Sequence, residues 1–218
     1  MSDESDHLAK RYYPDFAVAF VRGKMTDAPD LPPAEMVQLG LQKGLRLHKF
    51  KRTSELPRVR KVLGMLRGLA PCDLLDIGSG RGVFLWPLLD AFSWLPVLAL
   101  DRNPQRIEDI HAVRRGGIAR LTALVGDGCR VPLADKSVDV VTILEVLEHL
   151  PQPARAVGEA VRVARRGIIA SVPSKEDDNP EHIHLFTRDS LHALLRTAGA
   201  RRVHFDGVLN HLLALATV

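Results

Sequence analysis

The fold of this chain is decided by the stretch Leu74-Leu75-Asp76-Ile77-Gly78-Ser79-Gly80-Arg81-Gly82. It begins in an apolar run over residues 72–77 and ends in alternating glycines, after which residues 83–92 have the composition of an apolar helix. Glycine allows the backbone to turn sharply and to approach a ligand closely. The stretch therefore predicts a buried strand, a tight turn and a helix, with a ligand held at the turn. A turn that binds nothing is the alternative interpretation.

The sequence that follows alternates between strands and helices. Strands are predicted over residues 96–101, 121–125, 137–144, 167–172, 202–205 and 212–217, and helices over residues 105–113, 154–164 and 188–198. Such alternation is typical of an α/β fold, in which helices cover both faces of a mostly parallel sheet. In the preceding sequence, helices are predicted over residues 15–21 and 33–41 and from Pro57 to near Leu69.

The composition is that of a globular domain. The chain has 218 residues, of which 46% are hydrophobic and 26% charged, so it can bury a core and is neither disordered nor fibrous. Its two cysteines, Cys72 and Cys129, form no C-x-x-C pair, and a reducing, cytoplasmic location is the simplest expectation. The acidic start at residues 1–6 does not resemble a signal peptide. Residues 82–100 are apolar but contain an acid and two prolines, which predicts a helix, a turn and a strand instead of a membrane span.

Carboxylates occur at the ends of the first three predicted strands, as Asp76, Asp101 and Asp127. The glycine spacing is G-x-G-x-G and not the G-x-G-x-x-G of dinucleotide-binding proteins. A carboxylate beside the loop would repel a pyrophosphate and suits a cationic ligand that carries an ammonium and a sulfonium. Asp101 stands where an acid can accept two hydrogen bonds from a ribose diol, and Asp127 where one can meet an adenine amino group. The acids together predict one nucleoside pocket, whereas each alone is compatible with a solvated loop residue.

Three segments carry a resemblance to the class I S-adenosylmethionine (SAM)-dependent methyltransferases: residues 74–82, 100–103 and 131–141. The resemblance extends over residues 57–218. It implies a Rossmann-like fold with a seven-stranded, mostly parallel sheet, an antiparallel last strand and helices on both faces. Residues 57–218 would then form the SAM-binding methyltransferase domain, and residues 1–56 a helical, basic extension or lid.

The same resemblance implies roles for individual residues. By position, Asp76, Gly78 and Gly80 would hold the methionine moiety of SAM and Asp101 the ribose. Asp127 and Gly128 would hold the adenine. The remaining residues expected at the cofactor are Ser79, Gly82, Arg102 and Glu145.

Candidate catalytic residues follow the fourth and fifth predicted strands. Methyl transfer from a sulfonium is an in-line displacement, in which the protein mainly aligns the reacting groups. A hydroxyl or amine nucleophile also benefits from a base. His149 and His184 are the side chains we expect in that role, in a pocket that needs no metal.

A metal site is a second interpretation of these loops. The Glu-x-x-Glu-His pattern at residues 145–149, followed by two histidines, resembles small-RNA 3′-terminal ribose 2′-O-methyltransferases. That resemblance implies a divalent ion held by Glu145, Glu148, His149 and either His182 or His184, a mixed O and N ligand set. Residues 145–151 are also similar to small-molecule O- and N-methyltransferases that need no metal. In a third interpretation, His182 and His184 only cap or pack the following helix.

Positive charge is concentrated in residues 43–67, which contain nine Lys or Arg residues and one Glu, whereas the formal net charge of the whole chain is +4. This segment could contact RNA phosphates, an anionic small molecule or a lipid surface, or it could be a solvated face. Aromatic residues make up only 5% of the chain, which disfavours a platform for stacking single-stranded bases.

The sequence thus predicts a SAM-dependent methyltransferase that acts on a hydroxyl or amine of a small-molecule or lipid-like acceptor. Two alternatives stay open. One is a metal-dependent RNA ribose 2′-O-methyltransferase, with RNA bound through residues 43–67. The other is a non-catalytic SAM-binding or nucleic-acid-binding adaptor. The glycine spacing disfavours a dehydrogenase.

Overall fold

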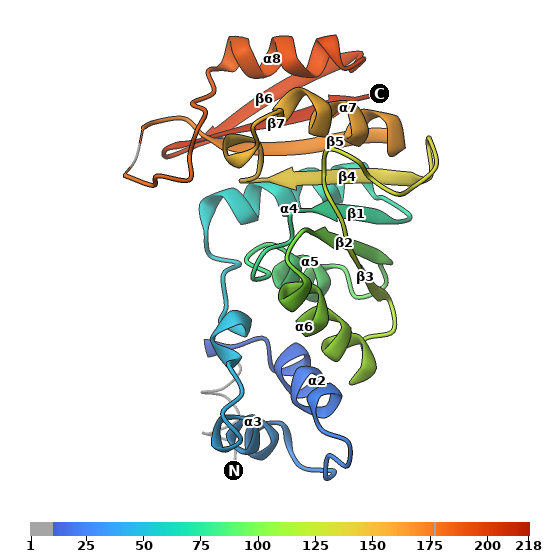
Figure 1. Ribbon diagram of the computed structural model, residues 1–218, viewed down its shortest axis with the longest axis vertical. Coiled ribbons are helices and arrows are strands. Elements are labelled where there is room, and N and C mark those ends of the chain that lie inside the picture. Colours follow the sequence, from blue (N-terminus) through green and yellow to red (C-terminus); the bar gives the residue numbers. More distant parts are fainter. Residues whose placement is uncertain (1–10, 177) are drawn as a thin grey trace.

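The computed structural model describes residues 11–176 and 178–218, which form an α/β fold (Figure 1). The strands are β1 Leu74–Ile77, β2 Val97–Asp101, β3 Leu121–Val125, β4 Val138–Leu144, β5 Ala164–Pro173, β6 Arg202–Val208 and β7 His211–Thr217. The α-helices are α2 Pro14–Lys24, α3 Pro33–Gln42, α4 Pro57–Leu69, α5 Leu85–Ala91, α6 Pro104–Arg115, α7 Pro153–Val163 and α8 Arg188–Thr197. Two 3-10 turns are η1 Leu47–Phe50 and η2 Leu147–His149.

The described strands form one seven-stranded sheet in the order β3-β2-β1-β4-β5-β7-β6. The pairs from β3 to β5 are parallel, and β7 runs antiparallel to both β5 and β6. This confirms the predicted Rossmann-like fold with an antiparallel last strand. Strand β1 is the first strand of the sheet in the sequence, and β2 and β3 follow on one side of it. Strand β4 then pairs with the other side of β1. The carboxyl ends of β1 and β4 are therefore the switch point at which open α/β sheets bind ligands.

Alternate residues of the strands face two hydrophobic clusters, one on each side of the sheet. Leu74 packs with residues of α4, α5 and α6, whereas its neighbour Leu75 packs with residues of α7 and α8. Every residue of β1 is consequently buried. A strand covered on both faces has no polar face, which explains the uninterrupted apolar runs in the sequence.

Most predicted elements are present, with two instructive differences at their ends. The helix after the glycine turn begins at Leu85, because residues 82–84 still belong to the turn. Strand β5 begins at Ala164, three residues before the predicted start, and follows α7 without a loop. Arg165 and Arg166 occupy this first part of β5, and both form ion pairs with Asp139. Because these two residues are charged, the apolar pattern predicted the start of the strand only at residue 167.

The described part of the N-terminal segment packs against the sheet-covering helices, with α2 lying beside α6 (Figure 1). The ring of Trp86 lies 5.8 Å from Phe16 and 4.9 Å from Phe50, measured between centroids. Residues on both sides of the predicted boundary at residue 56 therefore share one hydrophobic cluster. The division into an extension and a methyltransferase domain stays a prediction, and residues 1–10 lie outside the described part.

Helices α2 and α6 approach so closely that glycine is needed at the contact. A Cβ atom on Gly116 would lie 1.8 Å from the carbonyl oxygen of Ala19. We expect Gly116→Ala to lower the free energy of unfolding by about 1–3 kcal/mol, because backbone atoms have to move apart. Urea denaturation measures this change. Gly64→Ala on α4 is the matched control, since nothing lies within 4 Å of its added Cβ; an equal loss in both variants would contradict the close contact.

The basic residues 43–67 do not form one continuous face. Lys49 pairs with Asp109, Lys61 lies 2.7 Å from Asp206, and Arg67 lies over the ring of Phe92. Arg52 adds an ion pair with Asp90 at 3.7 Å. These four cations hold the segment against the rest of the protein.

Residues 82–100 fold as predicted, into the end of the glycine turn, α5 and β2. Within the described ranges, no helix combines the length and apolar character that crossing a membrane requires.

Candidate cofactor and acceptor site

Two adjoining cavities open at the switch point of the sheet. The larger, of about 540 Å³, runs along the ends of β1, β2 and β3 to His149. The smaller, of about 200 Å³, lies between α4, the glycine loop and the end of β4. Gly78, Gly80 and Glu145 line both cavities. One elongated ligand can therefore extend from one cavity into the other.

The glycine loop shapes the floor of both cavities. Gly78 and Gly80 have φ angles of +76° and +56°, in the left-handed region that favours glycine. A Cβ on Gly78 would lie 2.3 Å from Val146, whereas one on Gly80 would meet no protein atom within 3.5 Å. Gly80 thus presents open backbone to a ligand. Gly82 has a different role, because its Cβ would collide with the indole of Trp86, and it lines neither cavity.

Asp76 is the most unusual acid of the site, since its side chain is only 3% exposed. Its Oδ1 accepts a hydrogen bond from Thr142 Oγ1 at 2.7 Å, but its Oδ2 has no hydrogen-bond partner among the described residues. Burial raises the pKa of Asp76 to about 6, so the carboxylate is still ionised at pH 7. A buried anion with an oxygen in need of a donor suits an ammonium group.

Asp101 joins the end of β2 to the glycine loop. Its Oδ2 accepts from the backbone N–H of Gly80 at 2.8 Å, and its Oδ1 from that of Asn103 at 2.9 Å. Oδ2 also accepts from the Arg106 guanidinium at 3.4 Å, so Oδ1 is the oxygen whose second lone pair can still accept a hydroxyl proton. Asp101 and Arg102 line the larger cavity. The structure therefore places a fixed acceptor at the position predicted for the ribose.

The far end of the larger cavity is formed after β3. Gly126, Asp127 and Gly128 line it. Asp127 Oδ1 accepts from the backbone N–H of Cys129 at 2.8 Å, which fixes the turn. A Cβ on Gly128 would lie 2.9 Å from the side chain of Ile77, so the turn packs directly against β1. This is the end at which the adenine was expected.

Glu145 lies where the two cavities meet, with a φ angle of +55° that is rare for a residue other than glycine. Its carboxylate accepts from Ser171 Oγ at 2.6 Å and lies 3.1 Å from His211 Nε2. His211 begins β7, far from Glu145 in the sequence, and no motif marked it. Only the pairing of β5 with β7 could have shown this neighbour.

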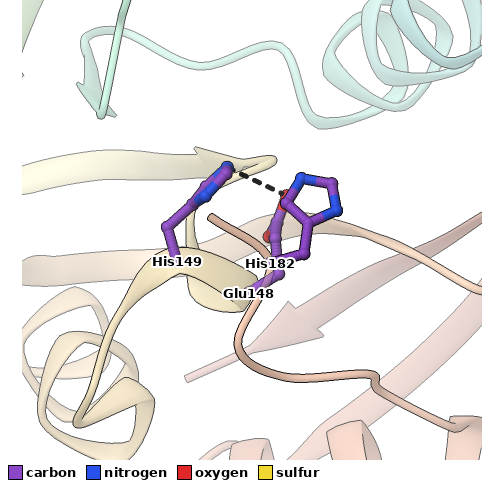
Figure 2. A group of neighbouring side chains, drawn as sticks. All are labelled: Glu148, His149 and His182. Carbon is purple, nitrogen blue, oxygen red and sulfur yellow. Dashed lines mark ion pairs between the residues drawn. The ribbon is translucent and has the colours of Figure 1, made fainter. Parts of the chain in front are cut away.

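Three of the candidate metal ligands come together, and they are Glu148, His149 and His182 (Figure 2). One ligand atom of each lies within 4.8 Å of the others, and Glu148 is 1% exposed. The other two candidates have different surroundings. Glu145 is bound to Ser171, and a ring nitrogen of His184 lies 2.9 Å from the carbonyl oxygen of Leu150. Of the two histidines after β5, the structure thus brings His182, and not His184, to the cluster.

The two candidate bases also differ in position. His149 lines the larger cavity, whereas His184 lines neither cavity. His149 Nδ1 lies 3.0 Å from the carbonyl oxygen of Glu181. Because a carbonyl only accepts, this contact places the proton of a neutral imidazole on Nδ1 and leaves Nε2 to take a proton.

Asp101→Ala is expected to weaken the binding of SAM. The change removes an acceptor from the ribose and also releases the N–H of Gly80. We expect the dissociation constant for SAM to rise about 10- to 100-fold, because charged hydrogen bonds each contribute about 1.5–3 kcal/mol. Isothermal titration calorimetry measures the effect. Asp135→Ala is the control, since Asp135 lies outside both cavities; unchanged affinity in Asp101→Ala would remove that residue from the site.

The structure is a Rossmann-like fold whose strand ends form two adjoining cavities lined by Asp76, Asp101 and Asp127. Residues 75–171 match a family model described as a methyltransferase domain. The match runs from β1 to β5 and includes the glycine loop and the three strand-end acids. Residues 75–171 are therefore similar to a methyltransferase domain, in agreement with the fold.

Known proteins are similar to parts of this chain. An uncharacterized methyltransferase of Mycobacteroides abscessus is 38% identical over 101 residues, which cover 44% of this chain and 37% of that protein. A malonyl-[acyl-carrier protein] O-methyltransferase of Methylococcus capsulatus is 29% identical over 153 residues, 64% of this chain and 55% of that protein. The chain thus spans about a third to a half of the length of these relatives.

A solved structure supports the fold. The SAM-dependent methyltransferase from Aquifex aeolicus superposes with a TM-score of 0.64 over 76% of this chain and 92% of that one, at 24% sequence identity. At this identity the likeness concerns the fold alone.

Proposed function

We propose that this protein transfers the methyl group of SAM to a hydroxyl or amine of a small-molecule acceptor. The observation that carries the proposal is Asp76, a buried carboxylate with an oxygen that lacks a hydrogen-bond donor, beside a glycine loop that exposes its backbone. SAM carries an ammonium, a sulfonium and a ribose diol, and the site offers an acid for its ammonium and for its ribose. The donor set therefore fits SAM.

The residues of the site bind and orient the reactants. Bound SAM supplies a methyl group activated by its sulfonium. Asp76 would hold the ammonium, Asp101 the ribose diol and the turn at Asp127 the adenine. These contacts fix SAM along the strand ends, so that alignment with the acceptor costs little further entropy. His149 would take the proton of the nucleophile on Nε2.

We assign the acceptor nucleophile to the junction of the two cavities beside Glu145, since Asp76 places the methionine end of SAM in the smaller cavity. The outer wall of the smaller cavity is formed by Val59 and Val62 of α4 and by Phe84, with Arg58 as the one cation of α4 that lines it. The O-methyltransferase named among the relatives supports an oxygen nucleophile.

A methyl-transfer screen tests the proposal. The purified chain is incubated with tritiated SAM and with separate pools of small metabolites and RNA. We expect transfer to a small molecule. Transfer to RNA alone would contradict the proposed acceptor class, and binding of SAM without transfer to any pool would favour the non-catalytic adaptor.

A second candidate function is metal-dependent methylation of an RNA ribose, and the cluster of Glu148, His149 and His182 is what favours it. One carboxylate and two imidazoles suit a divalent transition metal. Titration with Mn²⁺ or Zn²⁺ alone tests the cluster, with His182→Ala as the variant and His192→Ala as the control. Saturable binding lost only in His182→Ala, together with transfer to RNA that stops on chelation, would support this candidate. Full turnover after chelation would end it.

A further inference from the structure

A third cavity, of about 650 Å³, lies between the N-terminal segment and the methyltransferase fold. One wall comes from α2 and from residues 44–49, and the other from the glycine loop and the first half of α6. Gly80 lines this cavity and both cavities of the cofactor site. A ligand here would therefore lie directly beside bound SAM.

The cavity is strongly cationic. Among the described residues that line it, Asp109 is the only acid, and the Lys and Arg residues are Lys24, Arg46, Lys49, Arg81 and Arg106. Asp109 already pairs with both lysines, and Arg106 lies 3.4 Å from Asp101. Arg46 and Arg81 have no ion-pair partner within residues 11–176 and 178–218. Two guanidinium groups are thus available to an anion.

The neighbouring cavities differ in their balance of acids and bases. The cofactor cavities are lined by both acids and arginines, namely Asp76, Asp101, Asp127, Glu145 and Glu181 with Arg58, Arg81, Arg102 and Arg106. The third cavity would repel a cationic cofactor and attract an anion instead. Guanidinium groups bind phosphate with paired hydrogen bonds, and several cations around one cavity match its double charge.

The surroundings favour a small molecule over a nucleic acid. The aromatic rings of the cavity, Phe20 and Trp86, are each 2% exposed, so they form an apolar floor and cannot stack on a base. The positive charge is also local, since Lys61 and Arg67 of the basic segment contact the protein elsewhere. A nucleic acid requires a longer basic track.

We propose that this cavity binds a phosphate group of the methyl acceptor, whose reactive end then reaches the junction of the two cofactor cavities past Gly80. The substrate class is a phosphorylated small molecule. The assignment of the ligand as the acceptor rests on the proposed methyl transfer.

Calorimetric titration of the full chain with inorganic pyrophosphate, at low salt and with saturating S-adenosylhomocysteine, tests this proposal. We expect saturable binding that weakens about tenfold in Arg46→Ala and in Arg81→Ala, because each loses a charged contact. Arg60→Ala is the matched control from the same basic segment, and its affinity should equal that of the wild type. No binding, or equal binding in all variants, would overturn the site.

Two further measurements separate the alternatives. Displacement of pyrophosphate by S-adenosylhomocysteine would overturn the proposal, because the anion would then occupy the cofactor site. A short single-stranded RNA that binds at least tenfold tighter than pyrophosphate, and loses affinity in Arg60→Ala as well, would also overturn it in favour of a nucleic-acid surface. Affinity for S-adenosylhomocysteine in Arg46→Ala tests the proposed function separately, since Arg46 lines neither cofactor cavity.

Discussion

Replacing Asp76 with Asn is expected to weaken SAM binding about 100-fold or more, the largest loss of affinity predicted for this site. Asn keeps the shape of the side chain but removes the negative charge that the ammonium of SAM would meet. Removing one partner from a buried ion pair costs about 3–5 kcal/mol. Isothermal titration calorimetry with wild type and variant measures the loss. A change of less than threefold would show that Asp76 does not contact the cofactor.

The stability of the ligand-free protein should change in the opposite direction. Burial raises the pKa of Asp76 from 3.8 to about 6. The folded state therefore binds the proton more tightly than the unfolded state, and the associated stability is present below pH 3.8 and lost as the pH rises to about 6. At pH 7 the ionised carboxylate costs about 3 kcal/mol. Asp76→Asn should consequently be no less stable than the wild type at pH 7, although it binds SAM poorly.

The same pKa predicts how SAM affinity depends on pH. The ammonium of SAM needs the ionised form of Asp76, so binding should weaken about tenfold between pH 7 and pH 5. Asp101, whose charge contributes to the raised pKa, is one of the other acids that line the cofactor cavities, together with Asp127, Glu145 and Glu181. The affinity of Asp76→Asn for SAM should change much less between pH 7 and pH 5. An equal change in the wild type and in Asp76→Asn would assign the pH dependence to the other acids.

Replacing His149 with Ala is expected to lower kcat about 100-fold or more, while the dissociation constant for SAM changes little. General bases typically contribute factors of this size. His149 lines the larger cavity and is held by the carbonyl oxygen of Glu181, with Nε2 as the basic nitrogen. Single-turnover methyl transfer separates the chemical step from SAM binding.

His184→Ala is the informative comparison for this prediction. His184 contacts the carbonyl oxygen of Leu150 and lines neither cofactor cavity. Its loss should affect stability more than kcat. A larger loss of kcat in His184→Ala than in His149→Ala would assign the base to the other loop.

The sequence predicted those parts of the site that depend on local structure. A strand that ends in glycines positions Asp76 and the loop together, and the carboxyl ends of parallel strands bring Asp101 and Asp127 to the same edge. The positions of these residues could be predicted because each follows from its place at the end of a strand. The antiparallel last strand came from the family resemblance.

Other features depend on contacts between distant parts of the chain. Neither the pairing of Glu145 with His211 nor the choice of His182 for the cluster with Glu148 could be predicted from spacing, because each depends on how a loop folds over the sheet. The basic segment is the clearest case. Its composition suggested one charged face, whereas several cations contact the protein and others line a cavity beside the cofactor site.

Direct measurement of cofactor binding tests the central claim. The full chain is titrated calorimetrically with SAM, S-adenosylhomocysteine and NAD, alongside Asp76→Asn. We expect that both SAM and S-adenosylhomocysteine bind, that Asp76→Asn loses most of the affinity for each, and that NAD produces no binding heat. Binding of NAD without binding of SAM, or SAM binding unaffected by Asp76→Asn, would contradict this expectation.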